Sequence, residues 1–170
     1  PGNHDAVRQA EPQPALGLEF QKYFGKNTVF VGNPCYFALH GVDVLIYHGR
    51  SFDDIVKYIP EATYANPILP MKEILLRRHL VPIYGERTPT APEHHDYLLL
   101  DRLPDIFVTG HVHTAGCERF SDMLLINASA WQAQTSFQRT MNFNPDPCKA
   151  YIVNLNTIRA TELNFSARNF

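Results

Sequence analysis

Two histidines lie close together in Thr109-Gly-His-Val-His113, directly after the apolar run 106–108. In an extended backbone alternate side chains point to the same side, so His111 and His113 are predicted to share one face. Gly110 allows the chain to turn sharply beside them. Two imidazoles on one face at a strand end commonly present nitrogen ligands to one metal ion or to two adjacent ones. The alternative is a pair of ordinary surface histidines.

Two other places repeat this combination of a ligand-type side chain and a glycine. His48 follows the apolar run 44–47 and precedes Gly49, and Pro1-Gly-Asn-His-Asp5 sets three polar side chains after Gly2. Taken alone, the first predicts an ordinary strand-end histidine and the second a surface turn. Taken together with residues 109–113, they predict a shared polar site.

The composition limits the classes of protein to which the chain can belong. Its 170 residues predict a single domain, because domains average about 150 residues. With 45% hydrophobic and 19% charged residues, it is neither a disordered nor a membrane-spanning composition. Fifteen Lys and Arg against 17 Asp and Glu give a formal net charge of −2, so no overall positive field attracts nucleic acid. A role on DNA would need a local site or a partner.

The compartment is inferred from apolar runs and cysteines. No apolar run reaches the length of about 18 residues that a membrane span needs, and no leader is recognisable, so the chain is predicted to be cytoplasmic and without a membrane partner. Cys35, Cys117 and Cys148 fit neither a paired disulfide framework nor zinc-type spacing. We therefore expect reduced thiols.

Short strands and helices must position the candidate ligands, since 13 prolines argue against a long-helix bundle. The pattern predicts helices over residues 14–24, 52–59 and 70–80, and strands over residues 28–31, 36–39, 42–47, 106–109, 123–127, 151–155 and 160–165. Ser51 is predicted to cap the second helix, and the proline-rich segment 81–97 to form a long surface loop. The interleaved elements indicate a layered α/β domain with the candidate ligands at strand ends.

These residues carry a family resemblance. Gly-Asn-His-Asp at 2–5, Tyr-His-Gly at 47–49 and Gly-His-Val-His at 110–113 resemble, in this order, the last three motifs of the calcineurin-like metallophosphoesterases. Over nearly its whole length the chain is also similar to the small subunits of archaeal family D DNA polymerases, for instance in Leu45-Ile-Tyr-His-Gly-Arg-Ser51 and Trp131-Gln-Ala-Gln-Thr135. The resemblance implies a layered calcineurin-like β-sandwich flanked by helices and incomplete at the amino end. Residues 1–170 would be the carboxyl-terminal part of that domain.

The resemblance implies a two-metal phosphodiesterase with 3′→5′ exonuclease activity, using two divalent ions of which Mn²⁺ is the family's usual choice. The implied metal ligands are Asn3, His48 and His111 for one ion and His113 for the other. His4 would contact the scissile phosphate or assist the leaving group, and Asp5 would orient His4. Two adjacent cations can bind one phosphate and activate a water, and these oxygen and nitrogen donors suit Mn²⁺, Fe²⁺ or Zn²⁺.

Two earlier motifs of the family, an Asp-x-His and a Gly-Asp-x-x-Asp segment, do not precede Pro1. Asp53 and Asp54 do not replace them, because they are predicted to lie in the first turn of the helix 52–59. One ion would then keep three ligands and the other only one. We therefore expect the 170-residue chain alone to bind metal weakly and to hydrolyse little, while the complete subunit would be active.

The implied partners are the large catalytic subunit of a family D polymerase and DNA with a single-stranded or frayed 3′ end. Arg50 is the best candidate for a phosphate contact, because it lies two residues after His48. The remaining histidines have plainer interpretations: His40 as a turn residue, His79 as a cation at a helix end, and His94-His95 as surface residues.

Three functions remain open from the sequence. The first is a metal-dependent 3′→5′ exonuclease that proofreads within a polymerase. The second is a non-catalytic scaffold of the polymerase B-subunit type, and the third is a small-molecule phosphodiesterase of the same superfamily. The enzyme is favoured because all five carried-over polar positions are intact, and these are Asn3, His4, His48, His111 and His113.

Overall fold

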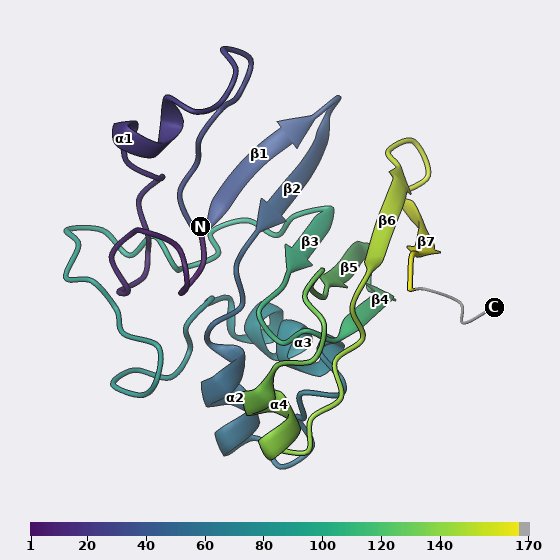
Figure 1. Ribbon diagram of the computed structural model, residues 1–170. Helices are drawn as coiled ribbons and strands as arrows, with labels where there is room; N and C mark the ends of the chain where they lie inside the picture. The colour runs from purple at the N-terminus through teal and green to yellow at the C-terminus, as the bar shows by residue number, and fades with distance from the viewer. Residues whose placement is uncertain (167–170) are drawn as a thin grey trace.

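The computed structural model describes residues 1–166 as a mixed α/β structure (Figure 1). Five strands form one mixed sheet in the order β1-β2-β3-β5-β4. Their bounds are β1 Cys35–Leu39, β2 Val42–Ile46, β3 Ile106–Thr109, β4 Ala115–Phe120 and β5 Met123–Ala128. The three central strands β2, β3 and β5 are parallel, and each edge strand is antiparallel to its neighbour. The predicted layered α/β class is thus confirmed in its coarse form.

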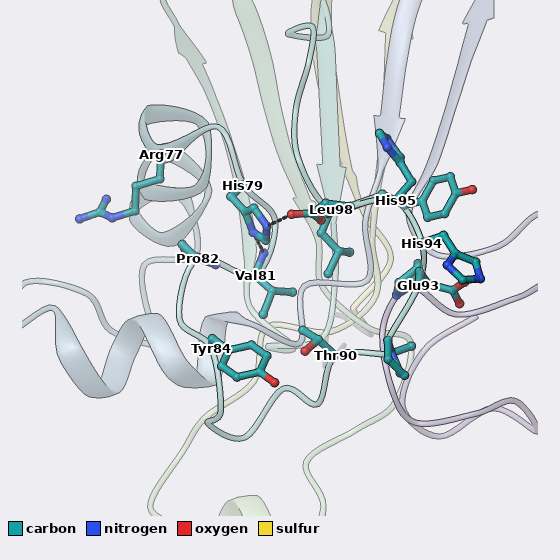
Figure 2. A pocket seen from close by; sticks show the side chains of 15 residues that line it. Arg77, His79, Val81, Pro82, Tyr84, Thr90, Glu93, His94, His95 and Leu98 are labelled. Carbon is teal, nitrogen blue, oxygen red and sulfur yellow. Dashed lines mark hydrogen bonds and ion pairs between the residues drawn. The ribbon is translucent and has the colours of Figure 1, made fainter.

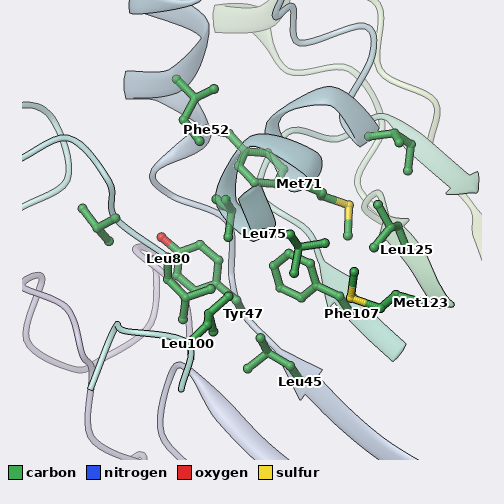
Figure 3. Packing of buried hydrophobic residues seen from close by; sticks show 14 of the residues in the cluster. Leu45, Tyr47, Phe52, Met71, Leu75, Leu80, Leu100, Phe107, Met123 and Leu125 are labelled. Atoms are coloured by element: carbon green, nitrogen blue, oxygen red, sulfur yellow. The ribbon is translucent and has the colours of Figure 1, made fainter. Parts of the chain in front are cut away.

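Two of the helices cover one face of the sheet. The helices of residues 1–166 are α1 Leu18–Gln21, α2 Phe52–Tyr58, α3 Ile68–Arg77 and α4 Ser136–Thr140, and α2 and α3 are the two that pack on the sheet. Phe52 of α2 and Met71 of α3 are fully buried against Leu45, Phe107 and Leu125, which project from the three central strands (Figure 3). Because these residues face one another across the layer, burial of apolar surface fixes α2 and α3 on the sheet. The chain between β2 and β3 is thereby anchored at both ends.

The opposite face of the sheet packs against a separate hairpin, β6 Lys149–Asn154 and β7 Arg159–Asn164 (Figure 1). Val44, Ile106 and Leu124 point to this side, each next in sequence to a residue of the helix-side core. The alternation is that of half-buried strands with two covered faces. The structure therefore has a five-stranded sheet with helices on one side and a two-stranded hairpin on the other.

Several sequence predictions hold with small shifts. The hairpin of β1 and β2 turns at His40 and Gly41, both with positive φ of 49° and 84°, as the right-handed twist of a tight hairpin requires. The predicted helix over 52–59 is α2, and the helix predicted over 70–80 is α3. Helix α3 begins before Pro70, which is tolerated in the first turn, and ends at Arg78 with φ 55°.

Other predictions are wrong. Residues 28–31 form no strand, because Val29 is 84% exposed and the segment has no pairing partner along its length. The helix predicted over 14–24 is only the four residues of α1. Strand β4 was not predicted, since Ala-Gly-Cys-Glu-Arg-Phe lacks β-branched residues, yet it pairs along its whole length with β5.

Two predictions concern the segments around α2. Ser51 stands at the N-cap of α2, but its hydroxyl makes no capping bond and instead donates to the Leu80 carbonyl at 2.5 Å. Residues 81–97 hold no helix or strand, so the long loop is confirmed.

Among the described residues, no helix is both long and apolar enough to cross a membrane.

Candidate metal site

The two parallel strands β2 and β3 bring His48 and His111 together. His48 lies two residues after β2 and His111 two residues after β3, and the carboxyl ends of parallel neighbours meet at the same edge of a sheet. The Gly110 amide donates to the His48 carbonyl at 3.1 Å, which joins the two loops. His111 Nδ1 then lies 3.3 Å from His48 Nε2, with the ring centroids 5.1 Å apart.

Glycines allow this close approach. Gly49 has φ of 100°, and a Cβ there would lie 3.2 Å from the Gly110 carbonyl oxygen. A Cβ on Gly2 would lie only 2.5 Å from the His48 ring. The amino-terminal segment therefore lies directly against His48, and Asn3 Oδ1 is 2.8 Å from His48 Nε2. Substituting a larger residue for Gly2 would displace one of the two partners.

Asn3 Oδ1, His48 Nε2 and His111 Nδ1 thus converge, and we refer to Asn3, His48 and His111 as the histidine site. Burial, and then the charge of His111, lower the pKa of His48 to about 4, so its imidazole is neutral at pH 7. A neutral imidazole has a lone pair for a metal ion. Within residues 1–166, no group of three or more His, Cys, Asp or Glu could hold a metal, so the third donor here is an amide oxygen. Two imidazoles and one amide oxygen fit a divalent first-row metal ion such as Mn²⁺, Fe²⁺ or Zn²⁺.

Asp53 is a site residue that the sequence interpretation missed. It was expected to act only in the first turn of α2, but its Oδ2 lies 3.2 Å from His111 Nε2, while the Tyr64 hydroxyl donates to Oδ1 at 3.0 Å. Burial raises the pKa of Asp53, yet the hydrogen bonds and charge of His111 and the Tyr64 hydrogen bond outweigh it, so the net pKa lies below its usual range. A carboxylate on the far nitrogen of a histidine orients the ring and leaves the near nitrogen available.

The neighbouring Asp54 has a different role, since its carboxylate accepts hydrogen bonds from the amides of Arg87 and Thr88 at 2.9 and 3.1 Å. It therefore holds the long loop against α2. Nothing in the linear pattern distinguishes Asp53 from Asp54. The only available signal was the helical spacing, which turns successive side chains about 100° apart and so lets just one of the two face the sheet edge.

His113 is placed by a different backbone from the one expected. His111 and His113 have positive φ of 69° and 50°, so the prediction of an extended segment is wrong and strand alternation does not set their directions. His113 Nδ1 lies 2.9 Å from Gln138 Nε2, which docks the ring on α4. Burial, and then the charges of His111 and His4, lower the pKa of His113. It belongs to the same electrostatic neighbourhood as the histidine site.

The remaining predicted site residues line the approach to the histidine site. His4 and Asp5 are exposed. Asp5 Oδ2 accepts a hydrogen bond from the Gly2 amide at 2.7 Å, and no hydrogen bond joins it to His4 within residues 1–166, so the expected orientation of His4 by Asp5 is not seen. Arg50 donates to the carbonyl and side-chain oxygens of Gln9 at 3.0 and 2.9 Å, which ties it to the amino-terminal segment.

A cavity of about 570 Å³ lies apart from these ligands, along the loop 81–97 (Figure 2). We call it the loop cavity; it is lined by residues that include His79, His94, His95, Tyr84 and Asp96. His79 was expected to be a cation in the last turn of a helix, but α3 ends before it. Its Nδ1 accepts the Val81 amide at 3.0 Å and its Nε2 lies 3.0 Å from Asp96 Oδ2. Both ring nitrogens of His79 are therefore engaged, one by a backbone amide and one by a carboxylate.

Comparison with known proteins confirms the resemblance to polymerase small subunits. The sequence model of the family formed by the B subunits of DNA polymerases alpha and epsilon matches residues 1–117, so the chain belongs to that family. The chain is similar to proteins named DNA polymerase II small subunit. It is 56% identical over 147 residues to the one from Archaeoglobus fulgidus, covering 86% of this chain and 30% of that protein. It is 43% identical over 169 residues to the one from Pyrococcus furiosus, covering 98% of this chain and 28% of that protein. The chain thus spans about 30% of the length of such relatives.

Proposed function

We propose that this chain forms part of the active site of a metal-dependent 3′→5′ exonuclease in the small subunit of an archaeal family D DNA polymerase. The observation that carries the proposal is the convergence of Asn3 Oδ1, His48 Nε2 and His111 Nδ1, with separations of 2.8 and 3.3 Å. The family and its relatives support the polymerase context, and the three donors support the metal. The motif order further supports a calcineurin-like fold for the complete domain.

In this proposal Asn3, His48 and His111 hold one divalent ion, and His113 is a ligand of a second. Mn²⁺ is the proposed metal because the metallophosphoesterases that the chain resembles usually use it, and imidazole and amide oxygen donors are compatible with Mn²⁺, Fe²⁺ or Zn²⁺. When bound, two such ions neutralise the charge on the scissile phosphate and lower the pKa of a bound water. The protein keeps the His48 imidazole neutral at pH 7 and orients the His111 ring through Asp53.

Two residues outside the proposed ligand set, His4 and Arg50, are proposed to contact the substrate. His4 follows the ligand Asn3 directly and is open to solvent, so it can contact the scissile phosphate or protonate the leaving oxygen. Arg50 carries a fixed charge beside the same segment and is the proposed contact for a DNA phosphate. A formal net charge of −2 means that affinity for a single-stranded or frayed 3′ end comes from the metals, these side chains and the large polymerase subunit.

The decisive experiment is His111→Ala in the complete subunit, with release of nucleotides from the 3′ end of single-stranded DNA followed in Mn²⁺. Loss of a ligand should lower the rate by at least about 100-fold, more than loss of an outer partner typically costs. His95→Ala is the matched control, because His95 is exposed in the loop cavity. Equal digestion by wild type and His111→Ala would overturn the assignment. An inactive wild type that still supports the polymerase would favour the scaffold alternative.

A further inference from the structure

A buried polar network lies directly behind His48. Its members are Glu11, Gln13, Asn33 and Tyr47, each at most 4% exposed. The Tyr47 hydroxyl donates to Glu11 Oε2 at 2.8 Å, and Asn33 Nδ2 donates to Glu11 Oε1 at 3.1 Å and to Gln13 Oε1 at 2.9 Å. Each oxygen of the Glu11 carboxylate therefore receives a donor. An ionised carboxylate can only accept, so the donors match it.

The buried network contacts both segments that carry the metal ligands. Asn33 Oδ1 accepts the backbone amide of His48 at 2.7 Å. Gln13 Nε2 donates to the carbonyl of Gly2, the residue before Asn3, at 3.2 Å and to that of Arg8 at 3.0 Å. The segment with Asn3 and the segment with His48 are thus tied to one set of buried side chains.

The backbone reinforces these side-chain contacts. Gln13 and Asn33 exchange amide-to-carbonyl bonds of 2.7 and 2.9 Å. The Tyr47 hydroxyl also accepts the Ser51 amide at 3.2 Å, which joins the network to the start of α2 and so to the helix that carries Asp53. Displacement of one residue of the buried network would therefore also move the segments that carry Asn3 and His48.

A buried carboxylate is a costly choice for this place. Taking an ionised group out of water is unfavourable unless hydrogen bonds replace the lost hydration, and apolar side chains would fill the same volume without that cost. What apolar side chains cannot do is set direction, because hydrogen bonds are directional and packing contacts are not. Buried polar side chains at this position are therefore explained if they hold the backbone of His48 in a single position.

We propose that Asn33 and Glu11 are positioning residues for the metal site: Asn33 fixes the His48 backbone, and Glu11 fixes Asn33. This inference rests on the proposed function, because the buried network can position metal ligands only if His48 and Asn3 bind a metal. Neither residue touches the metal, so both act through His48 and Asn3. Residues that orient metal ligands typically change metal affinity by about 10- to 100-fold when altered.

The test exchanges the charged and amide partners. In Asn33→Asp, two carboxylates face each other where Asn33 Nδ2 and Glu11 Oε1 now lie 3.1 Å apart. In Glu11→Gln, one amide donor must face either the Asn33 amide or the Tyr47 hydroxyl. In the double variant Asn33→Asp with Glu11→Gln, the new glutamine donates to the new aspartate, which still accepts the His48 amide. The bond from position 33 to Gln13 Oε1 is lost in Asn33→Asp and in the double variant, so the double variant restores only the pair with residue 11.

The readout is Mn²⁺ binding, measured by calorimetry on the complete subunit. We expect Asn33→Asp to weaken binding by about 10- to 100-fold and the double variant to recover part of that loss, binding more tightly than Asn33→Asp and more weakly than wild type. Leu75→Ala is the control, because Leu75 is buried on α3 outside the network, so it lowers stability while leaving Mn²⁺ affinity unchanged. A double variant as weak as Asn33→Asp, or equal weakening by Leu75→Ala at matched loss of stability, would overturn the proposal.

A second measurement needs no metal. In the metal-free protein, Asn33→Ala removes the acceptor of the His48 amide, so hydrogen exchange at that amide should accelerate by at least about tenfold relative to amides of β5. Unchanged protection would sink the positioning role even if the protein binds Mn²⁺. If the wild-type protein does not bind Mn²⁺ but Asn33 still protects the His48 amide from exchange, the proposed function is contradicted. The buried network would then only stabilise the fold.

Discussion

Two histidine–carboxylate pairs, His111 with Asp53 and His79 with Asp96, have similar contacts at one ring nitrogen and different partners at the other. The nitrogen-to-oxygen distances are 3.2 and 3.0 Å. In the histidine site, Asp53 engages Nε2 of His111, and Nδ1 faces His48. In the loop cavity, Asp96 engages Nε2 of His79, and the Val81 amide occupies Nδ1. The Nδ1 atom of His111 therefore faces another candidate ligand, whereas the Nδ1 atom of His79 faces a backbone amide.

This difference shows that the number of histidines near a cavity does not define a metal site. The loop cavity gathers three histidines, His79, His94 and His95, and His79 holds the turn after α3 by accepting the Val81 amide. The histidine site lies in loops at the sheet edge, where two strand ends and the amino-terminal segment bring two ring nitrogens and an amide oxygen within hydrogen-bond distance of one another. A ring nitrogen that no backbone group occupies is the more specific signal.

The largest predicted effect separates the two places directly. In the complete subunit, His48→Ala should weaken Mn²⁺ binding by more than about 100-fold, because it removes the central donor between Asn3 and His111. His79→Ala should leave Mn²⁺ affinity within about twofold of wild type, since its ring nitrogens are engaged elsewhere. Calorimetric titration with Mn²⁺ compares the two. Loss of binding in His79→Ala would place the metal in the loop cavity.

A smaller effect is expected from the paired carboxylates. Asp53→Ala leaves His111 Nε2 without its oriented partner and should weaken Mn²⁺ binding by about 10- to 100-fold. Asp96→Ala, the matched change in the loop cavity, should not alter affinity. Manganese electron paramagnetic resonance gives the bound fraction for each variant. If both aspartates behave alike, the distinction between the two pairs fails.

The smallest effect is a pH dependence of stability in the metal-free protein. The pKa of His48 is about 4 in the folded chain against 6.5 in its ordinary state. Between these values the unfolded chain binds a proton that the folded chain does not, so folding stability falls as the pH decreases from 6.5 toward 4. His48 should contribute about 1 to 2 kcal/mol to this loss, less than the full shift because the ring is partly solvated. Urea unfolding of wild type and His48→Gln across this range, with chelator present, should show a flatter slope for the variant; identical slopes would refute it.

Sequence patterns predicted the strand ends that carry His48 and His111, because short apolar runs bounded by glycine rarely adopt a structure other than a buried strand. They also predicted the hairpin turn at His40-Gly41. They failed for residues 28–31, where β-branched side chains have no partner strand, and for β4, where a partner strand stabilises a sequence of low propensity. Both errors have one cause, since strand stability depends on pairing rather than on the segment alone.

The supporting residues were beyond the reach of local patterns. Asp53 and His111 are 58 positions apart in sequence, and Glu11 and Tyr47 are 36 positions apart. Glu11 stands in an ordinary-looking proline-flanked segment, with no periodicity that would mark it as buried. The backbone at His111 and His113 was missed for a similar reason, because left-handed φ at a non-glycine residue is held by surrounding contacts.

The sequence by itself determined the types of donor, which are amide and imidazole side chains beside glycines, and placed two of the imidazoles directly after apolar strands. That these two strands are parallel neighbours, so that their ends meet at one edge of the sheet, is a feature of the tertiary structure. Tertiary structure also decided which partners each ring has. His111 Nδ1 faces a candidate ligand and His79 Nδ1 does not, because their second partners are His48 and the Val81 amide. A histidine ring has two nitrogens whose use depends on neighbours in space, and linear spacing does not encode those neighbours.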